Sequence, residues 1–456
     1  MKPIRAITAF AASLLLLAMC LKLVGQDPKA PGDRASIDAF IALVGNQPQE
    51  RVDSLKAIGE QWNVSDTGLM IEAARFARDV RTRTAILALL SSKTGKVFKD
   101  LDGWYDWIWN QDVDLHPNYA LFKHNLYRRL DPRFAEYFSD TYEAKIRLDE
   151  IRWGGVRRDG IPPLKNPETI PAAQASFLND TDVVFGVNFG GQSRAYPKRI
   201  LAWHEMVKDT VGGLSINGVY CTLCGSMIVY ETEFGGKHYE LGTSGFLYRS
   251  NKLMYDHETK SMWSTLKGKP VVGPLVGKGI KLKSRYVVTT TWGQWKADHP
   301  DTDVLSLNTG HRRDYGEGVA YNSYFATDDL MFTVPKTDKR LKNKDEVLIV
   351  REGGEPVAIS ADFLAANRVY HAQNGNVTFV VVTDNSGANR VYETASQMFD
   401  KHVSPRVIQS KDGMQWSVTE DALVSKDGSK TLKRLSAHRA FWFGWYADHP
   451  DVRLIK

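Results

Sequence analysis

The sequence has few cysteines and no large excess of charge of either sign. Only 3 of its 456 residues are cysteine, and the formal net charge is +6. So few cysteines exclude a disulfide-rich scaffold, which small secreted domains use in place of a large core. The basic residues are interleaved with acidic ones rather than gathered into the patch that nucleic-acid binding requires. We therefore expect no nucleic-acid partner.

The chain also lacks a second long apolar run. Its single run, from Ile7 to Cys20, follows Lys2 and Arg5, which is the layout of an export signal. No later run approaches the roughly 18 apolar residues that span a bilayer. We predict a signal peptide over residues 1–26 and an exported protein, periplasmic or extracellular, without a transmembrane domain in the mature chain. An N-terminal membrane anchor, through an uncleaved signal or a lipid on Cys20, is the alternative.

Residues 33–150 alternate helical patterns with short breakers. The apolar residues Ile37, Phe40, Ile41 and Val44 follow the i, i+3, i+4, i+7 spacing of one helix face. Similar patterns continue toward the end of this region. They predict an all-helical N-terminal domain.

The composition changes at Ile151. Residues 151–180 are rich in Gly and Pro and have no period, which is typical of a linker or of a segment that wraps over a neighbour. Short β-branched and aromatic runs follow, separated by turns such as Gly190-Gly191. The whole pattern predicts an α+β protein in which a β-rich domain follows the helical one.

Two stretches of the β-rich part resemble each other. The series of short motifs that begins at Asp182 returns from Asp345. VYET, then MWS (as MQWS from Met414) and then ADHPD recur in the same order. Four matches in one order indicate a duplication rather than chance. We predict two duplicated units, over residues 181–342 and 343–456.

The two units differ where reactive side chains stand. Aligning them places residues of the second unit at those of the first as follows: Asn367 at His204, Thr383 at Cys221 and Ser386 at Cys224. Because the second unit lacks the histidine and the cysteines, the fold itself does not require them. We expect the site in the first unit only, and a degenerate repeat after it.

The Cys221-x-x-Cys224 spacing suits either a disulfide or one metal ion. The candidate metal ligands are Cys221, Cys224, His204, Met254 and His257. Thiolates, imidazole and a thioether form a soft set that favours copper over zinc. A closed zinc site wants four ligands, and the chain has no second cysteine pair near this one. We predict a soft-metal site, or metal-dependent redox chemistry, at these residues.

Other chemistry stays open at this point. Glu205, Arg194 and Tyr196 are the candidate catalytic residues, as groups that orient a substrate or a ligand histidine. One alternative is a non-catalytic exported binding module that holds no metal and in which the cysteines form a structural disulfide. A second is a thiol-disulfide oxidoreductase, and a cysteine-nucleophile hydrolase is a minor one. Whether the protein is an enzyme is open, and its partner is an unknown small molecule or protein.

An ordered set of motifs carries a family resemblance. The motifs are RAYP from Arg194, WHE from Trp203, YCTLCG from Tyr220, LMYDHET from Leu253, RDYG from Arg313 and HRAFWFGW from His438. In this order they resemble the exported bacterial family of the DUF3179 type, a domain of unknown function. The resemblance covers roughly Ile151 to Ile455. It implies that RAYP, HE and YCTLC belong to one site, and it implies no particular activity.

Overall fold

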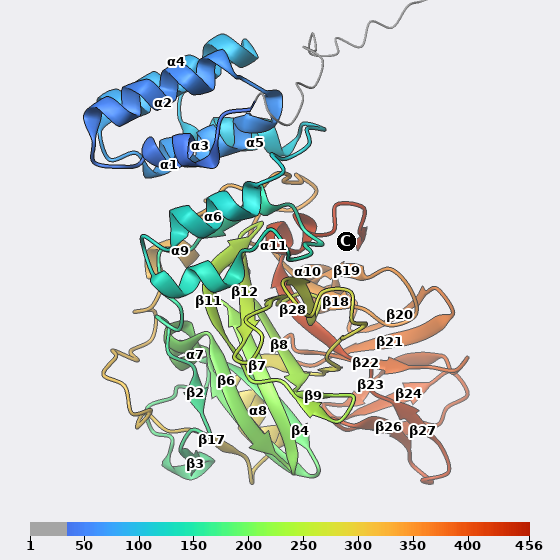
Figure 1. The fold of residues 1–456 in the computed structure, drawn as a ribbon. Helices are drawn as coiled ribbons and strands as arrows, with labels where there is room; N and C mark the ends of the chain where they lie inside the picture. Colours follow the sequence, from blue (N-terminus) through green and yellow to red (C-terminus); the bar gives the residue numbers. More distant parts are fainter. Residues whose placement is uncertain (1–33) are drawn as a thin grey trace, which may run out of the picture.

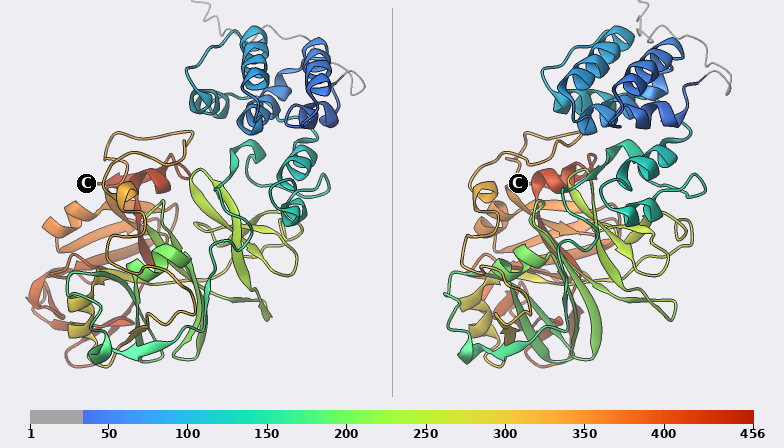
Figure 2. Two further views of the ribbon diagram at one scale, coloured as in Figure 1. Left: turned by 90° about the vertical axis from the view of Figure 1, so that its left-hand side faces the viewer. Right: turned by 60° about the vertical axis from the view of Figure 1, so that its left-hand side comes forward.

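The computed structural model describes residues 34–456. Helices form one end of the molecule and a strand-rich body forms the rest (Figure 1, Figure 2). The predicted signal peptide and Cys20 lie outside the described residues. Within residues 34–456, no helix combines the length and the apolar character that crossing a membrane would require.

The N-terminal region is helical, as predicted. Its helices are α1 (Ile37–Ala42), α2 (Pro48–Glu60), α3 (Thr67–Phe76), α4 (Val80–Thr94), α5 (Leu101–Trp109) and α6 (Tyr119–Tyr127), with the short 3-10 turns Val64–Asp66, Pro132–Tyr137 and Leu148–Glu150. The ends of α4 show why these boundaries arise. Asp79 caps its first turn by accepting the N–H of Thr82, and Gly95 ends it with a φ of 68°.

One apolar core joins this helical region to the first sheet. That sheet has the order β1-β11-β12-β13-β14, and its strands are β1 (Ile151–Trp153), β11 (Leu241–Tyr248), β12 (Asn251–Asp256), β13 (Met262–Ser264) and β14 (Lys269–Val272). Phe134 and Phe138 pack edge-on against Phe246 of β11, with ring centroids 4.8 and 5.4 Å apart. This core contains residues on both sides of residue 150, so it does not mark a boundary there. The predicted boundary between the helical domain and the linker stays a prediction.

The first unit contains two further sheets, with the orders β16-β4-β5-β17-β3 and β15-β8-β7-β6-β2. Their central elements are β4 (Val183–Phe189), β5 (Gln192–Pro197), α7 (Lys198–His204), β6 (Met206–Val211), β7 (Leu214–Cys221), β8 (Ser226–Glu231), β16 (Val288–Thr291), α8 (Trp292–Asp298) and β17 (Asp303–Leu305). Smaller pieces complete it: β9 (Glu233–Phe234), β10 (Lys237–His238), β15 (Ser284–Arg285) and α9 (Asn322–Phe325).

The Gly- and Pro-rich segment supplies edge strands to three sheets. β1 pairs with β11, β2 (Leu164–Lys165) pairs with β6, and β3 (Thr169–Pro171) pairs with β17. A 3-10 turn, Ala172–Gln174, follows β3. The segment therefore runs across the body of the molecule, which explains why it has no period of its own.

The second unit repeats this plan, with sheets in the orders β28-β18-β19-β29, β20-β21-β22 and β23-β24-β25-β26-β27. Its elements are β18 (Glu346–Val350), β19 (Val357–Ser360), α10 (Ala361–Ala366), β20 (Val369–Asn374), β21 (Val377–Thr383), β22 (Asn389–Glu393), β23 (Phe399–Ser404), β24 (Val407–Ser410), β25 (Gln415–Val418), β26 (Ala422–Ser425), β27 (Thr431–Lys433), β28 (Ala437–Phe441), α11 (Trp442–Tyr446) and β29 (Arg453–Ile455).

Strand pairing confirms that the β-rich part is built from two duplicated units. In the first, β4 pairs antiparallel with β5 and with β16, and β17 pairs parallel with β5. In the second, β18 pairs antiparallel with β19 and with β28, and β29 pairs parallel with β19. The order, direction and connecting helices are the same in both.

The same pairing corrects one predicted equivalence. Tyr220 donates its backbone N–H to the Glu205 carbonyl at 2.9 Å, and Thr383 donates to Arg368 at 2.8 Å. Thr383 therefore stands at Tyr220, and the next residue, Asp384, stands at Cys221. The motif alignment had placed Thr383 at Cys221. It could not detect that the turn after β21 is shorter than the turn after β7.

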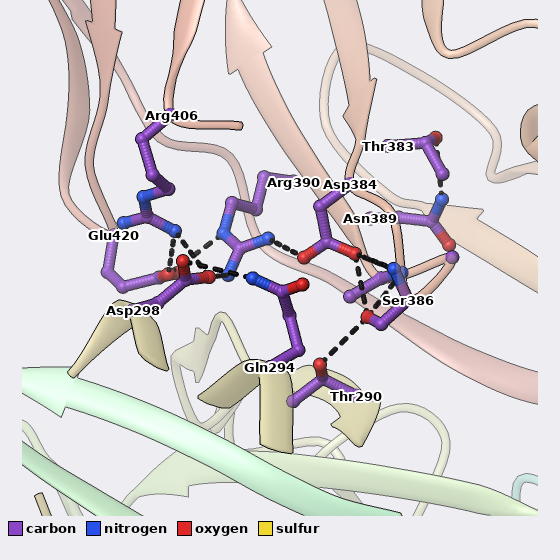
Figure 3. Close-up of polar contacts among 12 residues, drawn as sticks. Thr290, Gln294, Asp298, Thr383, Asp384, Ser386, Asn389, Arg390, Arg406 and Glu420 are labelled. Carbon is purple, nitrogen blue, oxygen red and sulfur yellow. Dashed lines mark hydrogen bonds and ion pairs between the residues drawn. The ribbon is translucent and has the colours of Figure 1, made fainter. Parts of the chain in front are cut away.

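A buried charge cluster joins the two units (Figure 3). Arg390 of β22 contacts the carboxylates of Glu420 and Asp384 at 2.8 Å each. Asp298, at the end of α8 in the first unit, lies 3.5 Å from the same guanidinium. This arginine thus holds acidic groups of both units together.

Candidate functional site

The two cysteines occupy the turn between β7 and β8. Cys221 ends β7, and Cys224 donates its N–H to the Cys221 carbonyl at 3.1 Å. Gly225 closes the turn with a φ of 57°, and a Cβ placed there would lie 2.8 Å from the ring of Phe441. Glycine is therefore required both by the backbone conformation and by the close approach of the second unit.

Both cysteines are buried free thiols. The sulfur of Cys224 lies 3.3 Å from the carbonyl oxygen of Ser250. The hydrogen bond from the Cys224 side chain lowers the pKa of Cys221, although burial acts against this. Burial first, and then the neighbouring Cys221, raise the pKa of Cys224 well above its ordinary value. Cys221 is accordingly the more acidic thiol of the pair.

Glu205 and Lys252 form a buried ion pair beside this turn. The Glu205 carboxylate lies 3.0 Å from Lys252 Nζ, and both residues are less than a tenth exposed. The hydroxyls of Thr222 and Tyr321 each lie 3.4 Å from Glu205 Oε1. The contact with Thr222 places this predicted residue at the cysteine turn, where its charge opposes ionisation of both thiols.

His204 faces away from the cysteines. Its Nδ1 lies 2.8 Å from the Pro162 carbonyl oxygen, and its Nε2 lies 2.6 Å from the Tyr315 hydroxyl. Because a carbonyl only accepts, Nδ1 carries the proton and Nε2 accepts the Tyr315 hydroxyl hydrogen. Burial lowers the pKa of His204. Both ring nitrogens of His204 are therefore engaged in hydrogen bonds within the protein.

Met254 and His257 also lie apart from the thiols. Met254 is part of a different apolar cluster, where the Asn217 amide lies 3.8 Å from its sulfur. His257 stacks on Tyr255 at 4.9 Å between ring centroids. Across residues 34–456, no three His, Cys, Asp or Glu side chains gather in a way that would hold a metal ion. The five predicted ligands therefore do not form one donor set, and only the two thiols meet.

Arg194 and Tyr196 belong to another buried cluster. Arg194 contacts the carboxylates of Asp209 and Asp303 at 2.8 and 2.7 Å, and Tyr196 donates its hydroxyl to Asp209 at 2.8 Å. This network ties β5 to β6 and β17. The family resemblance implied that RAYP, HE and YCTLC form one site. Of the side chains in RAYP and HE, only that of Glu205 makes a hydrogen bond to the cysteine turn.

Sequence reasoning missed Lys252 and Tyr321. Lys252 directly precedes the LMYDHET motif, but nothing in its neighbours marks it as the partner of Glu205. Tyr321 lies in a loop far along the chain. A lysine directly before the apolar run Leu253-Met254-Tyr255 is the one signal that would have drawn attention to Lys252.

Comparison with known proteins identifies the family but no activity. A family model described as "Protein of unknown function (DUF3179)" matches residues 158–452. No curated protein and no solved structure matches the chain. The matched residues include the cysteine turn and the motifs on which the resemblance rested, and they cover more than half of the chain. The chain therefore belongs to the DUF3179 family.

Proposed function

We propose that this protein is an exported thiol redox protein in which Cys221 and Cys224 alternate between a dithiol and a disulfide. The observation that supports this proposal is the pairing of two buried free thiols at one turn, where the Cys224 N–H lies 3.1 Å from the Cys221 carbonyl oxygen. The second unit has a shorter turn at this place, with Asp384 where Cys221 stands and no cysteine, and so lacks the chemistry. Perturbed thiol acidity at one turn of a duplicated fold favours a reactive role over a packing role.

The proposed reaction is exchange with a low-molecular-weight disulfide. The Cys221 thiolate attacks one sulfur, which forms a mixed disulfide and releases the first thiolate, and this takes a proton from solvent. Cys224 then attacks the sulfur of Cys221 and forms the internal disulfide, while its proton ends on the second leaving sulfur. A small disulfide is favoured because Cys221 is only 2% exposed and Cys224 is fully buried.

Binding of copper(I) by the two thiolates is the second candidate. It is favoured by the same adjacency of two free sulfurs in a buried site, because soft thiolates select copper(I). Zinc fits less well, since a closed zinc site takes four ligands and the described residues bring two together here. No step of the proposed exchange depends on a metal.

One experiment separates these candidates and the structural disulfide. The exported protein is equilibrated in buffers of varied reduced-to-oxidised glutathione ratio, alkylated, and analysed by peptide mass, while bound metal is measured by elemental analysis. We expect Cys221 and Cys224 to oxidise together as a two-electron couple, in metal-free protein, and Cys221→Ser to abolish this transition. Met254→Leu serves as the control and is expected to leave it unchanged.

Two results would overturn the proposal. Stoichiometric copper that survives Met254→Leu and is lost in Cys221→Ser and Cys224→Ser, with thiols that glutathione does not oxidise, supports the second candidate. A disulfide that forms at once and that no glutathione ratio reduces supports a structural staple in a binding module.

A further inference from the structure

A cavity of about 140 Å³ lies between the two duplicated units. Residues of the first unit that line it include Phe185, Lys198 and Thr289, and residues of the second unit include Glu346, Arg439 and Phe441. A hydrogen bond of 3.0 Å between the hydroxyls of Thr290 and Ser386 crosses the boundary beside it (Figure 3). The cavity therefore belongs to neither unit alone.

Equivalent strands of the two units form its walls. Thr289 of β16 pairs with Phe185 of β4, and Arg439 of β28 pairs with Leu348 of β18. Since β16 corresponds to β28 and β4 to β18, Thr289 and Arg439 are equivalent positions that face one cavity. The two sides of the cavity thus have equivalent strands and different side chains.

The charges in this cavity do not balance. Arg439 is neutralised by Glu346, 2.7 Å away, and donates further hydrogen bonds to Asn389 Oδ1. Lys198 has no carboxylate at ion-pair distance among the described residues, and its ammonium lies 4.2 Å from the ring centroid of Phe325. Burial lowers the pKa of Lys198, although Glu346 at longer range acts against this. One positive charge is left over, and a ligand carboxylate would compensate it.

We propose that this cavity binds a small organic carboxylate, which pairs with Lys198 and lays its apolar part against Phe185 and Phe441. A protein cavity of about 150 Å³ accommodates benzene, so the ligand has about six non-hydrogen atoms. The hydroxyl of Thr289, which has no hydrogen-bond partner among residues 34–456, supplies a second donor for the carboxylate. Aromatic walls with a few placed polar groups are typical of small-molecule sites between domains.

The site does not depend on the thiol chemistry. Its wall residue Phe441 donates a backbone hydrogen bond of 2.7 Å to the Cys224 carbonyl, so the two sites are neighbours. Binding is nevertheless expected in a Cys221→Ser variant, which allows the two proposals to fail separately.

Butyrate is the probe, measured by isothermal titration calorimetry and by ligand-observed NMR. We expect saturable 1:1 binding with a Kd of about 1 mM or tighter. Lys198→Met keeps the apolar stem of the side chain and should weaken binding at least tenfold, and Thr289→Val should weaken it several-fold. The exposed Lys281→Met is the matched control and should bind like the wild type.

Butylamine and inorganic phosphate complete the test. Butylamine has the same chain and the opposite charge and should not bind, and phosphate should not displace butyrate because it has no apolar part. Thermal melts of each variant establish that it is folded. Butyrate binding that is absent, that persists in Lys198→Met, or that phosphate abolishes at equal concentration would overturn the proposal.

Discussion

The hydroxyl oxygen of Tyr315 lies 2.6 Å from Nε2 of His204, and this hydrogen bond takes the nitrogen that a metal would need. The other nitrogen is held by Pro162. His204 therefore fastens the end of α7 to two distant segments of the chain, and its chemistry is that of a buried hydrogen-bonding group.

His204→Ala should lower the free energy of unfolding by about 1–3 kcal/mol, because it leaves the Pro162 carbonyl without its partner. Tyr315→Phe should cost about 1–2 kcal/mol, since it removes the hydrogen bonds to His204 and Thr309 and keeps the ring. Urea unfolding measures both. The redox transition of the cysteines should be unchanged in each variant, and its loss in His204→Ala would contradict the separation of His204 from the thiols.

The charge on Glu205 should restrain the reactivity of Cys221. The hydrogen bond from Cys224 lowers the pKa of Cys221, while the Glu205 carboxylate acts in the opposite direction. Glu205→Gln is therefore expected to speed alkylation of Cys221 at pH 7, and Cys224→Ala to slow it. Iodoacetamide kinetics with peptide mapping checks both signs, and a slower rate in Glu205→Gln would contradict this electrostatic account.

Lys252→Met should be strongly destabilising, by about 3–5 kcal/mol, because it leaves the buried Glu205 carboxylate unpaired. The double variant Glu205→Gln with Lys252→Met should recover most of that loss. Urea unfolding of the two single variants and the double variant forms the cycle. Additive effects in this cycle would mean that the two side chains do not interact.

Arg390→Met should cost about 3–5 kcal/mol, because Glu420, Asp384 and Asp298 would then face one another without their central cation (Figure 3). Arg406 is the matched control. It contacts the same Glu420 but is 27% exposed, so Arg406→Met should cost about 1 kcal/mol or less. An equal loss of unfolding free energy in the two variants would contradict the central role of Arg390 in the cluster.

Protonation of His116 should reduce stability in mildly acidic solution. Burial lowers the pKa of His116 to about 4, and its Nδ1 accepts the backbone N–H of Asn118 at 3.1 Å. The unfolded chain, with a histidine pKa of about 6.5, binds the proton first, so this contribution is complete above pH 6.5 and is lost as the pH falls toward 4.

Between pH 7 and pH 5 the expected loss from this histidine is up to about 2 kcal/mol. Urea unfolding of wild type and His116→Gln at both pH values isolates it, because the other groups titrate alike in the two proteins. A pH dependence that is the same in both would contradict a neutral, buried His116.

The class of fold could be predicted from the sequence because it depends on local patterns. Helical spacing from Ile37 onward and short apolar runs after residue 181 each report on their own segment, and the duplication appears as motifs in a repeated order. The sequence also showed that only the first unit contains the two cysteines. The proposed boundaries, the export signal and the metal stay predictions.

The composition of the site was decided by tertiary structure alone. His204 and Glu205 are adjacent in sequence, but the chain turns at Glu205 with a φ of 54°, so one side chain meets Tyr315 and the other meets Lys252. Spacing in the sequence cannot show this divergence, because it arises from a single backbone conformation at the end of α7. Lys252 reaches Glu205 because the sheet that carries β12 packs beside the cysteine turn. The sequence by itself determined which residue types stand at these positions, and only the packing of sheets determined which of them are neighbours.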